Sequence, residues 1–115
     1  MLKKFNDTFL RNYQKCTIIA KNNSDTLVGG VYGYSRSGVM FIEYLVVDQK
    51  YRIRGIGEEL LKGIEEIAKK QKCKTIFLDT FNAQKFYENR GYTTFNIIDF
   101  YEDGKKQCFM KKILS

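Results

Sequence analysis

The chain has 115 residues and a net charge of +7, from 20 Lys and Arg against 13 Asp and Glu. This length predicts one domain, residues 1–115, with a single core, and a hydrophobic fraction of 43% excludes an intrinsically disordered chain. No apolar run approaches the roughly 20 residues that a membrane span needs, and the mixed N-terminus has no signal-peptide core.

The cysteines indicate a reducing compartment. Cys16, Cys73 and Cys108 are odd in number and widely spaced, which favours reduced thiols in the cytoplasm over a disulfide framework. Because histidine and paired cysteines are absent from the sequence, we expect no metal site. The basic charge attracts phosphate, either in nucleic acid or in a phosphorylated cofactor.

The first half of the chain predicts one helix and three strands. Apolar residues recur at helical spacing over residues 2–14, which predicts a short amphipathic helix. Segments rich in β-branched and aromatic residues, separated by turn clusters, predict strands at 16–20, 27–34 and 39–47. The last of these, VMFIEYLVV, is nearly continuously apolar, which predicts burial on both faces.

The second half predicts a long helix from about Gly57 to Lys72, a buried strand at 75–79 and a short helix over 82–91 that ends at Gly91. A terminal hairpin follows, with strands in 92–101 and 106–114 around an Asp-Gly turn. A strand, a long helix and a strand in sequence suit a right-handed parallel crossover. We therefore expect an α/β (α+β) fold, with a mixed, mostly antiparallel central sheet, a parallel β-α-β crossover at its centre and helices on both faces.

The stretch YRIRGIGEELL, residues 51–61, places two arginines and two glycines directly before a predicted helix. The unpaired N–H groups of a first helical turn form an anion site, and glycines let a phosphate approach the backbone closely. The P-loop motif fails because Glu58 and Glu59 follow Gly57, and the dinucleotide-binding fingerprint fails because Leu60 replaces its third glycine. On glycine spacing alone, a phosphate loop and a plain surface loop remain equal alternatives.

Two blocks of sequence together resemble the GNAT N-acetyltransferase superfamily, in a small bacterial branch with a shortened N-terminus. The first block is Arg52, Gly55 and Gly57, which match its acetyl-CoA-binding signature. The second is AQKFYENRGY, which holds Ala83, Tyr87, Gly91 and Tyr92. The blocks occur in the family's order, separated by the expected helix and strand, and the resemblance covers roughly residues 27–114.

The resemblance implies a GNAT-like fold that binds acetyl-CoA as co-substrate. The pyrophosphate would lie on the backbone N–H groups of Arg52, Ile53, Arg54, Gly55, Ile56 and Gly57. The pantetheine arm would pair with the backbone of Leu45, Val46 and Val47, in a gap where the third strand splays from the next. The amide of Val46 or a neighbour would face the thioester oxygen as an oxyanion donor.

Two side chains are candidate catalytic residues for acetyl transfer to an amine. Glu43, in the middle of a strand, is the candidate general base, directly or through a water; the alternative is a glutamate that only binds a cationic substrate. Tyr87 occupies the position of the family's tyrosine general acid, which would protonate the CoA thiolate. Its alternative is a core aromatic residue beside Phe86.

The sequence departs from the family pattern in two places. Many members have a strand and two helices that shape the acceptor site, whereas here one predicted helix precedes the first strand. The acceptor site is therefore open, minimal, or completed by a second subunit of a homodimer. Thr80 stands where the family often has an asparagine, and Asn82 is positioned to cap the following helix instead.

Three functions remain open. The leading hypothesis is an acetyl-CoA-dependent N-acetyltransferase that acts on a small-molecule or peptide amine. The second is a CoA-binding protein of the same fold with little catalysis, acting as a sensor or partner module. The third, a small basic nucleic-acid binder, is disfavoured because the sequence carries no recognisable nucleic-acid motif. Neither a membrane partner nor a metal is expected.

Overall fold

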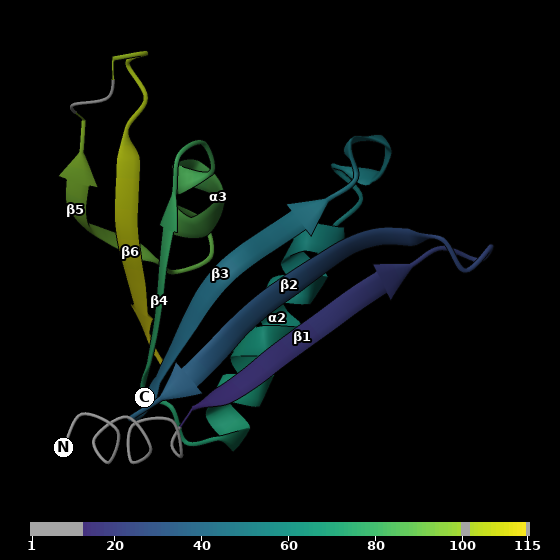
Figure 1. The fold of residues 1–115 in the computed structure, drawn as a ribbon, viewed down its shortest axis with the longest axis horizontal. Coiled ribbons are helices and arrows are strands. Elements are labelled where there is room, and N and C mark those ends of the chain that lie inside the picture. The colour runs from purple at the N-terminus through teal and green to yellow at the C-terminus, as the bar shows by residue number, and fades with distance from the viewer. Residues whose placement is uncertain (1–12, 100–101, 115) are drawn as a thin grey trace, which may run out of the picture.

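The computed structural model describes residues 13–99 and 102–114. These residues form one six-stranded sheet in the order β1-β2-β3-β4-β6-β5 (Figure 1). The elements in chain order are β1 (Gln14–Lys21), β2 (Leu27–Arg36), β3 (Val39–Val47), a single 3-10 turn η1 (Gln49–Tyr51), α2 (Ile56–Lys70), β4 (Thr75–Thr80), α3 (Gln84–Glu88), β5 (Thr93–Ile98) and β6 (Gln107–Ile113).

The sheet is mixed, as the sequence predicts. β3 and β4 are parallel and are joined by α2, whereas the other four pairs of neighbouring strands are antiparallel. This confirms the predicted mixed sheet with a central β-α-β crossover. The helix expected over residues 2–14 lies outside the described residues, except at its end, where Gln14 begins β1 rather than ending a helix.

Both described helices pack on the same face of the sheet. The apolar side of α2 buries Leu60, Leu61, Ile64 and Ala68, and these side chains share one core with Tyr87 of α3. The burial follows from the helical spacing of the apolar residues, which places them on a single stripe. Helices on both faces were expected, and a helix on the opposite face is not seen among the described residues.

The third strand is buried on one face in its first half, and Val39 and Phe41 on the other face are half-buried. Met40 and Ile42 are buried, but Glu43, Tyr44 and Val46 are exposed. The prediction that the whole apolar run would be buried on both faces is therefore wrong. The second half of β3 is not paired with β4. Side chains of a neighbouring strand therefore do not cover it on that side.

A buried polar network joins α2 to the C-terminal half of the sheet. Glu65 of α2 is only 9% exposed, and its carboxylate accepts hydrogen bonds from the Tyr92 hydroxyl at 2.8 Å and the Lys112 ammonium at 3.2 Å. Lys112 also donates to the Arg90 carbonyl at 3.0 Å. Burial and the neighbouring Glu65 carboxylate raise the pKa of Tyr92, so its hydroxyl stays a donor.

Glycines occupy β2 where α2 comes closest. A Cβ at Gly29 would lie 3.3 Å from Cδ1 of Leu60. A Cβ at Gly33 would lie 3.1 Å from Cδ1 of Ile64 and 2.5 Å from the carbonyl oxygen of Phe41. The missing side chains therefore set how closely α2 packs on the sheet, and with it the position of the start of α2.

We expect Gly33→Ala to lower the free energy of unfolding by about 1–3 kcal/mol, because the added methyl group overlaps backbone and forces a packed interface apart. Gly30→Ala on the same strand is the matched control, since its Cβ would meet the nearest atom at 3.4 Å. Urea unfolding of both variants measures the difference. Equal losses in the two variants would contradict a close-packing role for Gly33.

Candidate functional site

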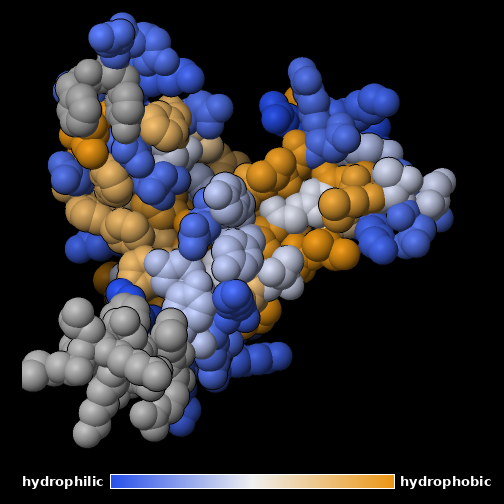
Figure 2. Space-filling model, viewed as in Figure 1, coloured by the Kyte–Doolittle hydropathy of each residue, from blue (hydrophilic) through white to orange (hydrophobic). Residues whose placement is uncertain are grey.

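β3 and β4 run side by side for a short distance and then separate. Their register has three pairs, of which Phe41↔Phe77 is the last. β3 nevertheless continues to Val47 and β4 to Thr80 without further pairing between them. The two strands diverge in Figure 1, and the molecular surface is hollowed between the two lobes in Figure 2. A strand edge inside the fold is therefore left open to a ligand.

A β-bulge marks the point where the strands part. Along the β2–β3 pair, Tyr32↔Tyr44 is followed by Gly33↔Ile42, so Glu43 is the extra residue on β3. Such a bulge bends its strand and increases its twist. The Glu43 side chain is exposed, and it has no ion pair or hydrogen bond within residues 13–99 and 102–114. The predicted base thus lies at the vertex of the opening.

The hydrogen-bond alternation of β3 decides which amides face the gap. The Asp48 N–H donates to the Val28 carbonyl at 2.8 Å, toward β2. Backbone N–H groups alternate in direction along a strand. The N–H groups of Tyr44 and Val46 therefore also point toward β2, whereas those of Leu45 and Val47 point toward the gap. The oxyanion donor was predicted to be the amide of Val46 or of a neighbouring residue. Because the Val46 amide faces β2, the candidates are the amides of Leu45 and Val47. The Val46 side chain is exposed, so the expectation that it is core is wrong.

The loop between β3 and α2 presents a run of free amides. Within the described part of the chain, the N–H groups of residues 53–58 have no hydrogen-bond acceptor, and the first bond of α2 runs from Glu59 N–H to the Gly55 carbonyl at 3.0 Å. Gly55 has φ 79° and exposed Ile53 has φ 73°, a left-handed conformation that a β-branched residue rarely adopts. Arg52 differs from the prediction, since its N–H donates to the Gln49 carbonyl at 3.4 Å.

Charged side chains surround these amides. The Nε of Arg52 donates to the Val47 carbonyl at 3.3 Å, and the Arg54 guanidinium lies 5.3 Å from the centre of the Tyr51 ring. Glu58, in the first turn of α2, would repel an anion, but it pairs with Arg90 at 3.4 Å. The helix dipole and the two arginines favour an anion at these amides, and Glu59, the other carboxylate of the first turn, opposes it.

The two sequence blocks meet in space at Gly57. A Cβ on Gly57 would lie 3.6 Å from the Phe86 ring and 3.7 Å from Cγ2 of Val47. The end of β3, the start of α2 and α3 therefore converge on one point. The sequence did not single out Phe86 or Arg90 for this arrangement, although the Arg90 guanidinium stacks 3.9 Å from the centre of the Phe86 ring.

Tyr87 is a buried phenol whose hydroxyl remains free. Its side chain is 7% exposed and makes edge contacts with Phe86 and Tyr92. Among the described residues, the Tyr87 hydroxyl has no hydrogen-bond partner. The Nε of Arg90 also has no partner and is fully buried, whereas the Tyr87 hydroxyl keeps some contact with solvent. Burial and, to a lesser degree, the Asp79 carboxylate raise the pKa of Tyr87 to about 12. The group is therefore a protonated donor at neutral pH.

The departure at Thr80 has a structural explanation. The Thr80 hydroxyl accepts a hydrogen bond from the Ala83 N–H at 3.0 Å. Ala83 is the N-cap of α3, and no side chain caps this helix. The predicted capping role of Asn82 is therefore wrong, and Thr80 stabilises the entry into α3 from three residues upstream.

The residues present fit an extended, anionic thioester cofactor such as acetyl-CoA. Free amides at a helix start suit its phosphates, and the outward amides of Leu45 and Val47 suit a pantetheine arm lying beside a strand edge. No group of three or more His, Cys, Asp or Glu side chains in the described residues is arranged to hold a metal ion.

Within the same residues, no helix has the length and apolar character that crossing a membrane requires.

Known proteins that are similar to this chain are acetyltransferases. The model of the acetyltransferase (GNAT) family matches residues 1–92. A curated acetyltransferase of Agrobacterium fabrum is 29% identical over 97 residues, which are 83% of this chain and 71% of that protein. A crystal structure of an acetyltransferase from Bacillus cereus has a TM-score of 0.87 and 30% identity, and the match covers 97% of this chain and 85% of that one.

The fold also recurs at lower identity. The crystal structure of a GNAT-family acetyltransferase from Staphylococcus aureus has a TM-score of 0.77 at 23% identity, over 99% of this chain and 76% of that one. The family resemblance inferred from Arg52, Gly55, Gly57 and the Tyr87 block is confirmed, because the family model spans most of the chain. The chain belongs to the acetyltransferase (GNAT) family.

Proposed function

We propose that this protein is an acetyl-CoA-dependent N-acetyltransferase that transfers the acetyl group directly from the thioester to a primary amine. The observation that carries the proposal is the free amides of residues 53–58 at the mouth of the gap between β3 and β4. This arrangement offers one site for phosphates and, next to it, one site for an extended arm. A small-molecule or peptide amine would enter from the open side.

The proposed reaction assigns one task to each polar group around the gap. The acceptor ammonium loses a proton to Glu43, directly or through a water, because an alkylamine has a pKa near 10 and is mostly protonated at pH 7. The amine nitrogen then bonds to the acetyl carbon while the carbon–sulfur bond breaks, and the second proton of the nitrogen leaves to water, from which the Tyr87 phenolate is reprotonated after it has protonated the thiolate. An N–H of Leu45 or Val47 stabilises the developing oxyanion, and the Tyr87 hydroxyl gives its proton to the departing thiolate.

The compartment proposed is the cytoplasm. Cys16, Cys73 and Cys108 are all buried as free thiols, which suits a reducing environment. A second subunit that completes the acceptor site in a homodimer is compatible with the open side of the gap.

We expect Gly57→Glu to weaken acetyl-CoA binding at least roughly tenfold, because a carboxylate beside the phosphate site adds like-charge repulsion. Gly57→Ala is the matched control, since its methyl group meets Phe86 and Val47 at ordinary contact distances of 3.6 and 3.7 Å. Calorimetric titration of the native chain and of both folded variants makes the test. No saturable binding to the native chain would refute the proposed cofactor.

We expect Tyr87→Phe to lower kcat by roughly ten- to a hundredfold while the acetyl-CoA Kd stays unchanged, because only the proton donor is lost. The expected loss is small for general acid catalysis because a thiol with a pKa near 8.5 is a good leaving group as the unprotonated thiolate. Tyr92→Phe is the control: it removes the hydrogen bond to Glu65 and lowers stability, but leaves kcat intact. Binding without turnover in the native chain would support the sensor function instead.

We expect Glu43→Gln to lower kcat/KM at pH 7 roughly a hundredfold. The deficit should shrink as the pH approaches the pKa of the acceptor amine, because the free amine then needs no base. The pH profile of kcat/KM for both proteins measures this. A raised KM with unchanged kcat, constant across pH, would show that Glu43 only binds the cationic substrate.

A further inference from the structure

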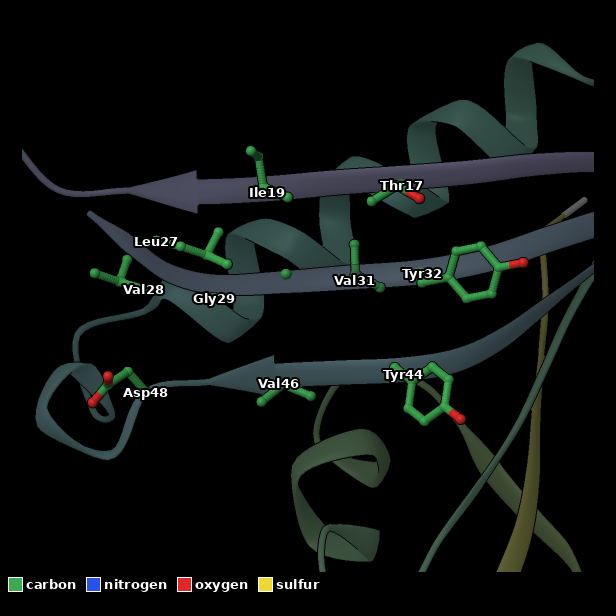
Figure 3. Close-up of a pocket in the computed structure, with 11 residues that line it drawn as sticks. Thr17, Ile19, Leu27, Val28, Gly29, Val31, Tyr32, Tyr44, Val46 and Asp48 are labelled. Atoms are coloured by element: carbon green, nitrogen blue, oxygen red, sulfur yellow. The ribbon is translucent and has the colours of Figure 1, made fainter. Parts of the chain in front are cut away.

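The sheet face opposite α2 carries an apolar groove over β1, β2 and β3. The groove has a volume of about 420 Å³, within the range of about 300–1,000 Å³ typical of small-molecule sites. Figure 3 shows the three strands with α2 behind them and the rings of Tyr32 and Tyr44 side by side on neighbouring strands. Four large hydrophobic residues in the groove are more than half exposed: Ile19 55%, Leu27 57%, Val46 58% and Tyr44 63%.

The groove borders the gap between β3 and β4. Tyr44 and Val46 line the groove, and they belong to the part of β3 that has no pairing with β4. Leu45, between them, directs its amide toward the gap. A ligand lying across these side chains would thus have one end beside the proposed thioester site.

Two carboxylates near the groove, those of Asp48 and Glu43, differ in whether they already have a hydrogen-bond partner. Asp48 closes one end (Figure 3), and its Oδ1 accepts the Lys50 N–H at 3.0 Å as the cap of η1. Glu43 does not line the groove itself, but it directly precedes the lining residue Tyr44 on β3 and has no counter-ion within the described residues. Five residue steps separate the two along the chain, which corresponds to about 16 Å between their backbones at about 3.3 Å per residue. The stretch between them is apolar.

Aromatic rings lie near Glu43 at the end of the groove that Tyr32 and Tyr44 form. The rings of Tyr32 and Tyr44 stack with their centres 6.4 Å apart. A hydrogen bond to Tyr32 and, among smaller effects, the nearby Glu43 carboxylate raise the pKa of Tyr13. An ammonium placed here would meet a carboxylate and aromatic faces, both of which attract cations.

We propose that the acceptor is an apolar primary monoamine, with its ammonium beside Glu43 and Tyr44 and its hydrocarbon body in the groove over Val46 and Ile19. This inference rests on the proposed acetyltransferase function and names the substrate class of that site. A second ammonium in the same ligand would lie over the apolar middle of the groove, where it loses hydration without gaining a partner. The net charge of +7 further disfavours polycations.

The first experiment compares acceptors of equal length in the presence of acetyl-CoA. Hexylamine and hexane-1,6-diamine differ only in the second amine, which is too near the first to reach Asp48. We expect kcat/KM for hexylamine to exceed that for the diamine by roughly tenfold or more, as expected for discrimination by an apolar pocket. Equal or better use of the diamine would overturn the inference.

The second experiment alters the groove without touching the proposed catalytic groups. Ile19→Ser should reduce kcat/KM for hexylamine roughly fivefold, because apolar contact area is lost. Ile113→Ser is the matched control, since this isoleucine of β6 is also exposed, at 62%, but lies outside the groove. Similar effects of the two substitutions would count against the groove as the acceptor site.

A binding measurement separates this inference from the proposed function. In protein with labelled isoleucine methyl groups, hexylamine should shift the Ile19 resonance saturably and leave Ile113 unmoved. Shifts without acetylation of any amine would support the groove as an amine site and refute the acetyltransferase. Acetylation without shifts at Ile19 would retain the enzyme and overturn the apolar-amine site.

Discussion

The structure depends on the loss of pairing between β3 and β4 beyond Phe41 and Phe77. A central parallel pair normally holds such a sheet together along its length, and unpaired backbone groups inside a fold are unfavourable unless something satisfies them. Here the sheet is continuous at one end and divided at the other. Connections outside the sheet must therefore hold the divided end in place.

α2 and its polar partners provide those connections. Its apolar side packs under β1, β2 and β3, and on the other lobe its Glu65 holds Tyr92 and Lys112 while Glu58 reaches Arg90. The same packing aims the free amides at the start of α2 toward the gap. The burial that fixes α3 against this helix also raises the pKa of Tyr87 to about 12. One set of contacts thus keeps the gap open, positions the amides and keeps the phenol protonated.

Much of this organisation follows from local sequence patterns. The helical spacing of apolar residues predicted α2, and the apolar run over residues 39–47 predicted β3. Gly91, with a left-handed φ of 92°, follows α3 as expected. The Arg52, Gly55 and Gly57 signature marked the loop whose amides are free, and Gly55, with φ 79°, supplies there a conformation that glycine adopts without strain. Boundaries were less certain: the helix expected over 82–91 spans Gln84–Glu88, and its cap is not Asn82.

The sequence by itself determined the six strands, the two described helices, their order and the family, because periodicity, glycine positions and motif spacing are local properties. The tertiary structure alone decided that Glu43 is a bulged residue at the vertex of the gap, that Leu45 and Val47 rather than Val46 direct their amides into it, and that Tyr44 and Val46 line an exposed groove. These features depend on strand register and on a missing pairing. Both arise from contacts between residues distant in the chain, which a pattern of neighbouring side chains does not encode.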